Sequence, residues 1–258
     1  MRTAPGFEAV VLRIQTLARW VLLAGIALMG LMHAIITWAA PGTWSPALAD
    51  MVNVDREHNI PTWFSSAQIV VLALVFFAIA FHENVTQHRR FATFFWCVCG
   101  CVALYLSMDE TAEIHEALGD VLGHRLKAAP PGTFLYDVDA FPSYYWALIY
   151  VPIAVPFGVA FGWFAIREMV GSRGLAIFGL VVFAFGAVVL DHLEGRYGNE
   201  EHQRLLFHLG DQAFRFDIFL VEELCEMVGV FMLIEAGFRH LLLKGKQAAV
   251  ASSVPDSP

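Results

Sequence analysis

Long apolar runs separated by short polar segments dominate the chain. The six runs cover residues 17–39, 61–81, 91–106, 142–166, 175–190 and 216–238. A helix needs about 20 mainly apolar residues to cross the hydrocarbon core of a bilayer, and these runs approach or exceed that length. The pattern therefore predicts an all-α fold, a polytopic membrane bundle of six transmembrane helices.

The polar segments predict how the chain is divided. Because its end is rich in Ala, Ser and Pro, we expect one integral membrane domain over residues 1–240 and a disordered tail over 241–258. Leu205, Leu206 and Leu209 fall on one helical face, which indicates a helix at the membrane interface. Gly158 and Gly162 form a small-xxx-small pair, which predicts the close approach of a neighbouring helix.

Composition agrees with a membrane protein and excludes two other classes. The chain is 58% hydrophobic and 16% charged, and its mean hydropathy of +0.60 is too high for a soluble domain. No cluster of Lys and Arg is interleaved with aromatic residues, so nucleic acid is not an expected partner. Membrane lipid is the expected partner, and the pattern does not indicate an oligomeric state.

Lys and Arg predict the orientation, because cytoplasmic segments of membrane proteins carry an excess of them. With both termini inside, the inner segments hold more of these residues, and closer to the ends of the apolar runs, than the outer segments. The inner set is Arg2, Arg13, Arg19, Arg89, Arg90, Arg167, Arg173, Arg239, Lys244 and Lys246, and the outer set is Arg56, Arg125, Lys127, Arg196, Arg204 and Arg215. We therefore predict that both termini are cytoplasmic.

Acidic residues and a histidine recur where four of the runs reach one level of the predicted membrane. Counted from the basic or first residue at the inner end of each run, Asp109, Asp191 and Glu222 lie about 25–27 Å along their helices, and His33 about 21 Å. Ionisable groups inside a membrane are costly and are functional-site candidates by default. The inner halves of the runs, in contrast, are nearly free of charge.

Many carboxylates in one low-dielectric site must share protons or bind cations. Carboxylate-rich sets with one or two histidines suit Fe, Mn, Mg or Zn, so the sequence predicts a divalent metal ion as cofactor. The candidate ligands are Asp109, Glu110, His115, Glu116, Asp191, His192, Glu222, Glu223 and Glu226, and the residues expected around them are His33, Asp55, Glu57, Asn59, Glu113 and Glu194. The Glu-x-x-His spacing of ferritin-like two-metal sites is absent, which argues against that class.

Three stretches together resemble a family of bacterial multi-pass membrane proteins of unknown function. They are the Asp-x-Glu-x-Asn-x-Pro-Thr-Trp-Phe-Ser-Ser element at 55–66, the pairs Asp109-Glu110 and His115-Glu116, and the pair Glu222-Glu223 with Glu226. The resemblance covers roughly residues 20–240. It implies a multi-pass fold in the bacterial cytoplasmic membrane and a place near the site for Asp55, Glu57 and Asn59, but no activity and no substrate.

Three functions stay open from the sequence. The first is an outward-facing metal site that serves chemistry on a lipid or another apolar substrate, with one carboxylate as a general base that the pattern does not single out. The second is a proton- or cation-coupled transporter, against which the uncharged inner halves argue. The third is a non-catalytic assembly or sensor protein, in which Arg125, Arg196 and Arg215 neutralise the carboxylates.

Overall fold

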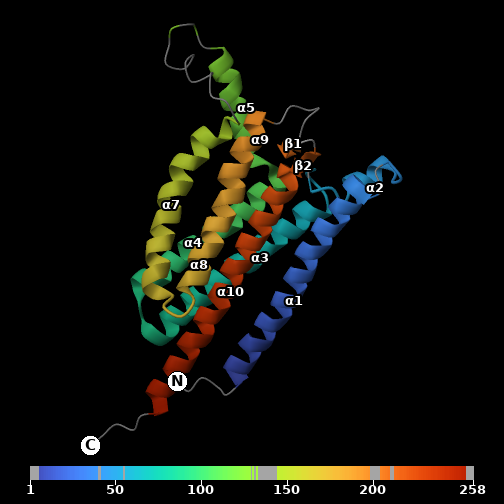
Figure 1. Cartoon of the computed structure of the whole chain (residues 1–258). Helices are drawn as coiled ribbons and strands as arrows, with labels where there is room; N and C mark the ends of the chain where they lie inside the picture. The colour runs from blue at the N-terminus through green and yellow to red at the C-terminus, as the bar shows by residue number, and fades with distance from the viewer. Residues whose placement is uncertain are drawn as a thin grey trace, which may run out of the picture.

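A bundle of long helices forms the body of the protein in the computed structural model (Figure 1). The structure describes residues 6–39, 42–54, 56–128, 130, 132, 144–197, 204–209 and 212–253. This part of the chain is helical except for one short β-hairpin. The start of α1 and the end of α10 lie at the same end of the bundle (Figure 1).

The elements follow one another along the chain as helices interrupted by three π-helical turns, here labelled η. They are α1 (Gly6–Ala34), η1 (Ile35–Ala39), α2 (Pro46–Asp50), α3 (Ile60–His82), η2 (Glu83–Gln87), α4 (Arg90–Ala112), α5 (Ile114–Lys127), α7 (Trp146–Glu168), α8 (Arg173–Ala184), η3 (Phe185–Leu190), α9 (Asp191–Tyr197), β1 (Arg204–Leu209), β2 (Gln212–Asp217) and α10 (Ile218–Ser253).

Five helices are long and apolar enough to cross a membrane. Within the described residues they cover Glu8–Trp38, Ile60–Gln87, Arg90–Ala112, Trp146–Glu168 and Arg173–Gly195. They coincide with the first five predicted runs, so the helical, membrane-type architecture is confirmed apart from the β-hairpin. The sixth run lies in α10, which has 36 residues but carries Glu222, Glu223, Glu226 and Glu235. Its length would suffice for a span, and its composition alone does not identify it as one.

The segment before α10 differs from the prediction. Strand β1 pairs antiparallel with β2, and Leu209 lies opposite Gln212. The interfacial helix expected for Leu205, Leu206 and Leu209 is therefore wrong. The sequence between the strands is Gly210-Asp211, a two-residue combination typical of tight hairpin turns, and this local signal outweighs the helical spacing of the leucines.

The end of the chain also differs from the expected disordered tail. Helix α10 continues to Ser253, and residues 254–258 lie outside the described part. Tertiary contacts hold the first turn of this extension, because Leu241 is buried in the core at 4% exposure and the Lys244 ammonium lies 3.0 Å from the Glu83 carboxylate. These contacts stabilise the helix beyond the apolar run.

Aromatic packing joins α3, α4 and α7. Trp96 is fully buried, and its ring lies 5.5 Å from that of Phe76 and 5.3 Å from that of Phe164, centroid to centroid. Of the predicted glycine pair on α7, only Gly162 lies against a neighbouring helix: a Cβ there would lie 3.6 Å from the Ile177 side chain of α8, whereas a Cβ at Gly158 would meet nothing within 4 Å. Helices α8 and α10 make a closer glycine contact. A Cβ at Gly229 would lie 2.5 Å from the backbone nitrogen of Phe183.

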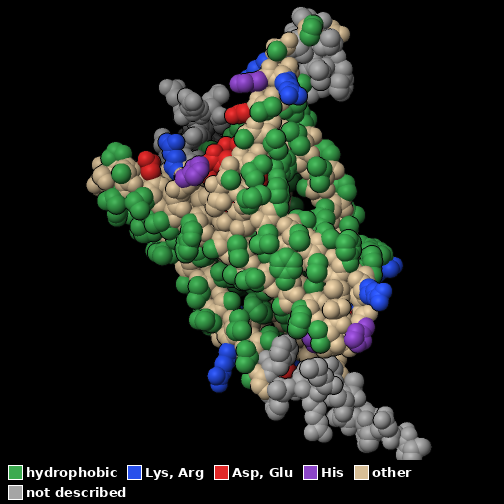
Figure 2. All heavy atoms as spheres, turned by 180° about the vertical axis from the view of Figure 1, so that it is seen from behind, with side chains coloured by type: hydrophobic (Ala, Val, Ile, Leu, Met, Phe, Trp, Pro, Cys, Tyr) green, Lys and Arg blue, Asp and Glu red, His purple; other side chains and the backbone are tan. Residues whose placement is uncertain are grey.

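The two ends of the bundle differ in charge. The acidic end holds Glu57, Asp109, Asp191 and Glu222, and the basic end holds Arg19, Arg89, Arg239 and Lys244. Figure 2 shows hydrophobic side chains over the middle of one face and charged side chains gathered towards both ends. This distribution is typical of a bundle whose middle lies in hydrocarbon and whose ends reach water.

Candidate functional site

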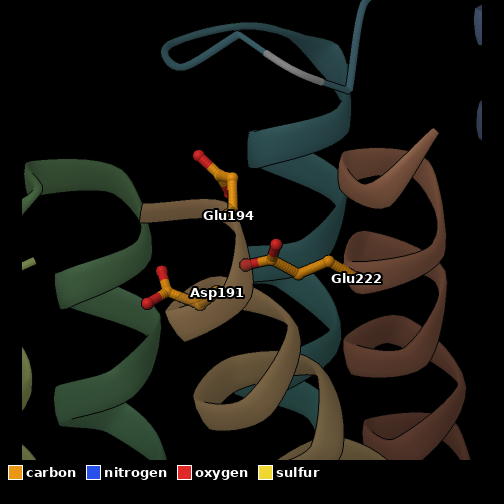
Figure 3. Close-up of side chains that lie close together, drawn as sticks. All are labelled: Asp191, Glu194 and Glu222. Atoms are coloured by element: carbon orange, nitrogen blue, oxygen red, sulfur yellow. The ribbon is translucent and has the colours of Figure 1, made fainter. Parts of the chain in front are cut away.

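Three carboxylates meet at the acidic end, where α9 approaches the first turns of α10. Asp191 opens α9, Glu194 follows one turn later, and Glu222 projects from α10 towards both (Figure 3). One ligand oxygen from each side chain lies within 4.8 Å of the other two. The described part of the chain brings together no other such group of three. The sequence predicted Asp191 and Glu222 as ligands and Glu194 as a neighbour.

Gly186 of η3 makes this approach sterically feasible. A Cβ at this position would lie 2.9 Å from the backbone oxygen of Glu222 and 2.9 Å from Cγ of Glu226. Contacts under 3.0 Å force the neighbouring atoms to move, so a larger residue at this position would push α10 away from η3 and α9. The glycine thereby determines the separation between Asp191 and Glu222.

Glu222 is the most enclosed of the three carboxylates. Its residue is 8% exposed, and its Oε2 has no hydrogen-bond partner in the described part of the chain. The other two carboxylates have neutral donors beside them, because Tyr144 donates to Glu194 Oε1 over 2.6 Å and Trp146 donates to Asp191. A buried carboxylate oxygen without a donor is costly, and a cation or a shared proton would satisfy it.

Tyr144 acts as a donor because its phenol stays protonated. Burial raises the pKa of Tyr144, and its hydrogen bond to Glu194 and the charge of that residue raise it further. Neither Tyr144 nor Trp146 was predicted from the sequence. Their types at the start of α7 carry no metal-ligand signal, and only the tertiary contact between α7 and α9 identifies them.

A second arrangement links α4 to α5. Glu113, between the helices, has a left-handed backbone with φ of 51°, which turns the chain sharply. Asp109 then accepts hydrogen bonds from the backbone nitrogen of His115 over 2.9 Å and pairs with its Nδ1 over 2.9 Å. Burial alone would lower the pKa of His115, but the hydrogen bond and the charge of Asp109 outweigh it and raise the pKa.

The Asp109–His115 pair lies close to the three carboxylates. The His115 ring packs edge-on against Trp146, with 5.2 Å between centroids, and Trp146 donates to Asp191. Asp109 is 7% exposed and also accepts from the Tyr150 hydroxyl over 3.4 Å. Asp109 therefore faces the interior of the bundle. Its Oδ1 accepts from the backbone of α5 and from Tyr150 of α7, and its Oδ2 pairs with the His115 ring of α5. Asp109 is therefore not part of the three-carboxylate group.

Four further glutamates form a neighbouring acidic group. Glu223 of α10 lies within electrostatic range of Glu226, Glu110 and Glu57, and Glu110 accepts a hydrogen bond from Ser65. Burial raises the pKa of Glu57 to about 7, and the nearby charges of Glu110, Glu116 and Glu113 contribute further. Of the predicted ligands, Asp191 and Glu222 thus lie in the three-carboxylate group, and Glu110, Glu223 and Glu226 lie in this adjacent one.

Two of the predicted residues, His33 and Asn59, have structural roles. His33 pairs with Asp217 over 3.1 Å and accepts from the backbone nitrogen of Val54 over 3.3 Å, which joins α1 to the start of α10. The Asn59 side chain accepts from the Thr62 nitrogen over 3.1 Å and caps α3.

The other predicted residues lie around the two groups. Glu113 pairs with His58 over 3.0 Å. Glu116 is exposed on α5 and His192 is half-buried on α9. Asp55 lies outside the described residues. Of the arginines expected to neutralise the carboxylates, Arg125 is exposed on α5, and the side chains of Arg196 and Arg215 are not described.

The basic end corrects the expectation that the inner half is nearly free of charge. Glu235 is 5% exposed and accepts hydrogen bonds from Gln15 over 2.8 Å, from Arg239 over 3.0 Å and from Arg19. Glu83 is fully buried and pairs with Lys244. Charge is present here in paired form, which the sequence alone could not show because the partners lie on different helices.

Comparison with known proteins identifies a family without naming an activity. Residues 14–241 match a family described as a domain of unknown function, DUF8692. The chain belongs to this family. No curated protein and no solved structure matches it. The family match covers the first membrane-length helix from residue 14, the other four completely, the three-carboxylate group and most of α10.

Proposed function

We propose that this member of the DUF8692 family is a multi-pass membrane protein that binds a divalent metal ion between Asp191, Glu194 and Glu222. The supporting observation is the buried Glu222, whose Oε2 has no described hydrogen-bond partner and which points towards two other carboxylates (Figure 3). Three negative charges this close repel one another strongly in a low-dielectric site. A divalent cation would neutralise most of that charge.

The ligand types narrow the choice of metal. Three carboxylates without histidine or cysteine suit Mg²⁺ or Mn²⁺ better than Zn²⁺. Three protein ligands would leave other coordination positions for water or substrate. We therefore expect Mn²⁺ and Mg²⁺ to bind more favourably than softer ions.

We propose that the bound metal serves chemistry on a lipid or another apolar substrate. The Asp109–His115 pair supports this use, because Asp109 holds Nδ1 of His115 and leaves Nε2 as the atom that can exchange a proton with water or substrate. Six spans, with α10 as the sixth and both termini cytoplasmic, would place the site at the outer leaflet of a bacterial inner membrane.

The metal proposal is tested by thermal denaturation and elemental analysis of the full-length protein in detergent. We expect Mn²⁺ at about 100 times its Kd to stabilise the wild type at pH 7 by about 2.7 kcal/mol. The effect should be much smaller near pH 4.5, because protonated carboxylates no longer ligate. Glu222→Gln should abolish both the stabilisation and the bound metal.

The matched control is Asp120→Asn, which removes one exposed carboxylate from α5 at the same end. It should retain the metal effect. Glu83 and Glu168 are unsuitable controls, since they pair with Lys244 and Arg89. If chelator and metals leave the stability of the wild type and both variants unchanged at both pH values, the metal site is refuted and proton sharing explains the cluster.

A coupled transporter is a second candidate, and one observation favours it. Gln68 of α3 is 1% exposed, and neither its amide nitrogen nor its amide oxygen has a described hydrogen-bond partner. It lies about 12 Å along α3 from Ile60, between the acidic and basic ends. The test is a flux assay on protein reconstituted in vesicles. Movement of protons or Mn²⁺ across the vesicle membrane that is lost with Gln68→Leu would establish transport. No flux above that of protein-free vesicles would exclude it.

A further inference from the structure

Helix α7 separates from the bundle over its middle turns. Nearer the basic end it packs closely, because Phe161 is 4% exposed and a Cβ at Gly162 would lie 3.6 Å from Ile177 of α8. One turn towards the acidic end, a Cβ at Gly158 would meet nothing within 4 Å. Residues 152–156 are all exposed. Because five successive residues point to every side of a helix, no side of α7 is packed against the described chain at this level.

Ile153 shows that the separation leaves a gap on the inner side of α7. Helical spacing puts Ile153 on the same face as Tyr150 and Phe157. Phe157 packs against the hydrophobic core and Tyr150 donates to Asp109 of α4, yet Ile153 between them is 69% exposed. The prolines within residues 152–156 explain the separation, because a proline inside a helix removes a backbone hydrogen bond and bends it. Figure 1 shows α7 curving along the edge of the bundle.

The walls of this gap are apolar. On α8, Ala184 lies on the face that carries Ile177 and is exposed, so a small side chain stands where α7 would otherwise pack. On α4, helical spacing puts Val102 on the face that carries Phe95, whose ring lies 4.0 Å from that of Phe164 of α7. The gap also lies within the membrane-length part of α7, Trp146–Glu168. Its surroundings therefore suit a hydrocarbon chain better than a polar ligand.

Polar groups meet at the outer end of the gap. The hydroxyl of Tyr150 is hydrogen-bonded to that of Tyr105, which joins α7 to α4. Trp146, about 10 Å along α7 from Ile153, donates to Asp191. Asp191 belongs to the three-carboxylate group, so the apolar gap ends beside the candidate metal site.

We propose that this gap holds one acyl chain of a phospholipid, whose phosphate lies at the outer end beside Trp146 and Asp191. The inference rests on the proposed function and names the substrate class of the same site. Mg²⁺ is usually bound by a few carboxylates together with phosphate oxygens of a substrate, so a phosphate here would complete the coordination of the metal. A molecule with an apolar chain at one end and a phosphate at the other matches both parts of the site, whereas a water-soluble substrate would leave the gap unfilled.

The test measures phospholipid retained by the full-length protein. Wild type and variants are reconstituted in nanodiscs of phosphatidylcholine, released into mild detergent and examined by native mass spectrometry. We expect wild type to keep one phosphatidylcholine, and Ile153→Trp, which fills the gap, to abolish its retention. Val155→Trp is the matched control. Val155 is 52% exposed and lies at the same level on the opposite face of α7, so this variant should retain the lipid.

A variant on the other wall shows whether the gap itself is responsible. Ala184→Trp fills the same space from α8 and leaves α7 unchanged, so it should abolish retention as Ile153→Trp does. Both variants should unfold at the wild-type temperature in lipid-free detergent, because Ile153 and Ala184 are exposed and each new side chain enters open space.

Added Mn²⁺ tests the phosphate end of the proposal. In wild type it should increase the fraction of protein that retains phosphatidylcholine. It should not increase the retention of diacylglycerol, which carries the same acyl chains without a phosphate. Glu222→Gln should lose the increase, because it removes a ligand of the metal.

Two results would overturn the inference. They are equal lipid retention by Ile153→Trp and Val155→Trp, and an equal effect of Mn²⁺ on the retention of the two lipids. Elemental analysis of the same samples separates this failure from that of the proposed function. Either result in wild type that contains the metal refutes the inference alone, whereas wild type that binds no metal refutes the proposed function and the inference with it.

Discussion

Asp109 illustrates how one side chain can direct a whole segment. It is the last buried residue of α4, and the left-handed Glu113 follows it before α5 begins. By binding both the backbone and the ring of His115, Asp109 caps α5 and fixes the direction of the imidazole at once. Substitution of Asp109 would therefore disturb the α4–α5 turn as well as the proton chemistry of His115.

Glu57 gives a pH-dependent prediction. Burial, and the nearby charges of Glu110, Glu116 and Glu113, raise its pKa in the folded protein from the ordinary 4.5 to about 7. The folded state therefore holds this proton more tightly, and ionisation costs stability as the pH rises from 4.5 to 7. Because Glu57 is exposed to solvent although acidic side chains surround it, water screens much of the repulsion, and we expect a cost of ~1 kcal/mol.

Glu57→Gln should therefore raise Tm by about 2–4 °C at pH 8 and leave it unchanged near pH 4.5. Thermal denaturation of wild type and variant across this range checks the expectation. A gain of the same size at both pH values would mean that Glu57 is not an ionised, repelled group in the folded protein.

At the scale of elements, the contact between α8 and α10 positions the site. Gly179 and Gly229 face each other across this contact, and a Cβ at Gly179 would lie 3.0 Å from the Gly229 oxygen. Two turns further along α8 and η3, Gly186 continues the close approach as far as Glu222. The three glycines form a stripe that holds the two helices together from mid-bundle to the acidic end.

Gly229→Ala should destabilise the protein by about 1–3 kcal/mol, because the new Cβ would meet the backbone of Phe183 and neither helix can yield without moving the other. Gly158→Ala is the matched control. Its Cβ would meet nothing within 4 Å, so we expect it to be neutral or to stabilise α7 by about 0.5–1 kcal/mol. Chemical or thermal denaturation of both variants measures the difference, and equal losses would contradict the role of the stripe.

The sequence predicts the helices well and the site less well. Apolar runs locate five membrane-length helices, because the length and apolar composition of a segment suffice to identify a helix that can cross a membrane. The grouping of carboxylates depends on the rotation of α10 about its axis, which places Glu222 beside Asp191 and leaves Glu223 within electrostatic range of Glu110. Spacing within one helix gives the angle between two residues, but it does not say which neighbour each one faces.

At the scale of the whole molecule, the two ends handle buried charge differently. At the basic end, Glu235 is surrounded by Gln15, Arg19 and Arg239. At the acidic end, Glu222 faces two other carboxylates. The same chemical change, from a carboxylate to an amide, should therefore have opposite effects on stability at the two ends.

We expect Glu235→Gln to lower the free energy of unfolding by about 2 kcal/mol, because charged hydrogen bonds to two arginines are lost. Glu222→Gln, measured with chelator at pH 7, should raise it, because one repelling charge is removed. Urea or thermal unfolding of both variants in one detergent gives the comparison. A loss of stability in both would show that Glu222 is compensated in the metal-free protein.

The orientation of the whole bundle can be tested by labelling. If both termini are cytoplasmic, a cysteine placed at Pro130, between α5 and α7, should react with a membrane-impermeant reagent added outside intact spheroplasts. A cysteine at His88, between η2 and α4, should react only after lysis. The reverse pattern would invert the topology and place the acidic end inside the cell.

The π-helical turn η3 has a consequence for where related proteins can lose or gain a residue. Such a turn takes up one residue more than an α-helical turn, and η3 directly precedes Asp191. Removing Val188 should therefore convert η3 to α-helix and leave Asp191 and Glu194 opposite Glu222. Adding one more residue to η3 than the π-helical turn can accommodate would rotate Asp191 and Glu194 by about 100° about the helix axis. Natural one-residue deletions are therefore expected within residues 185–190, and they should be rarer between Asp191 and Glu194.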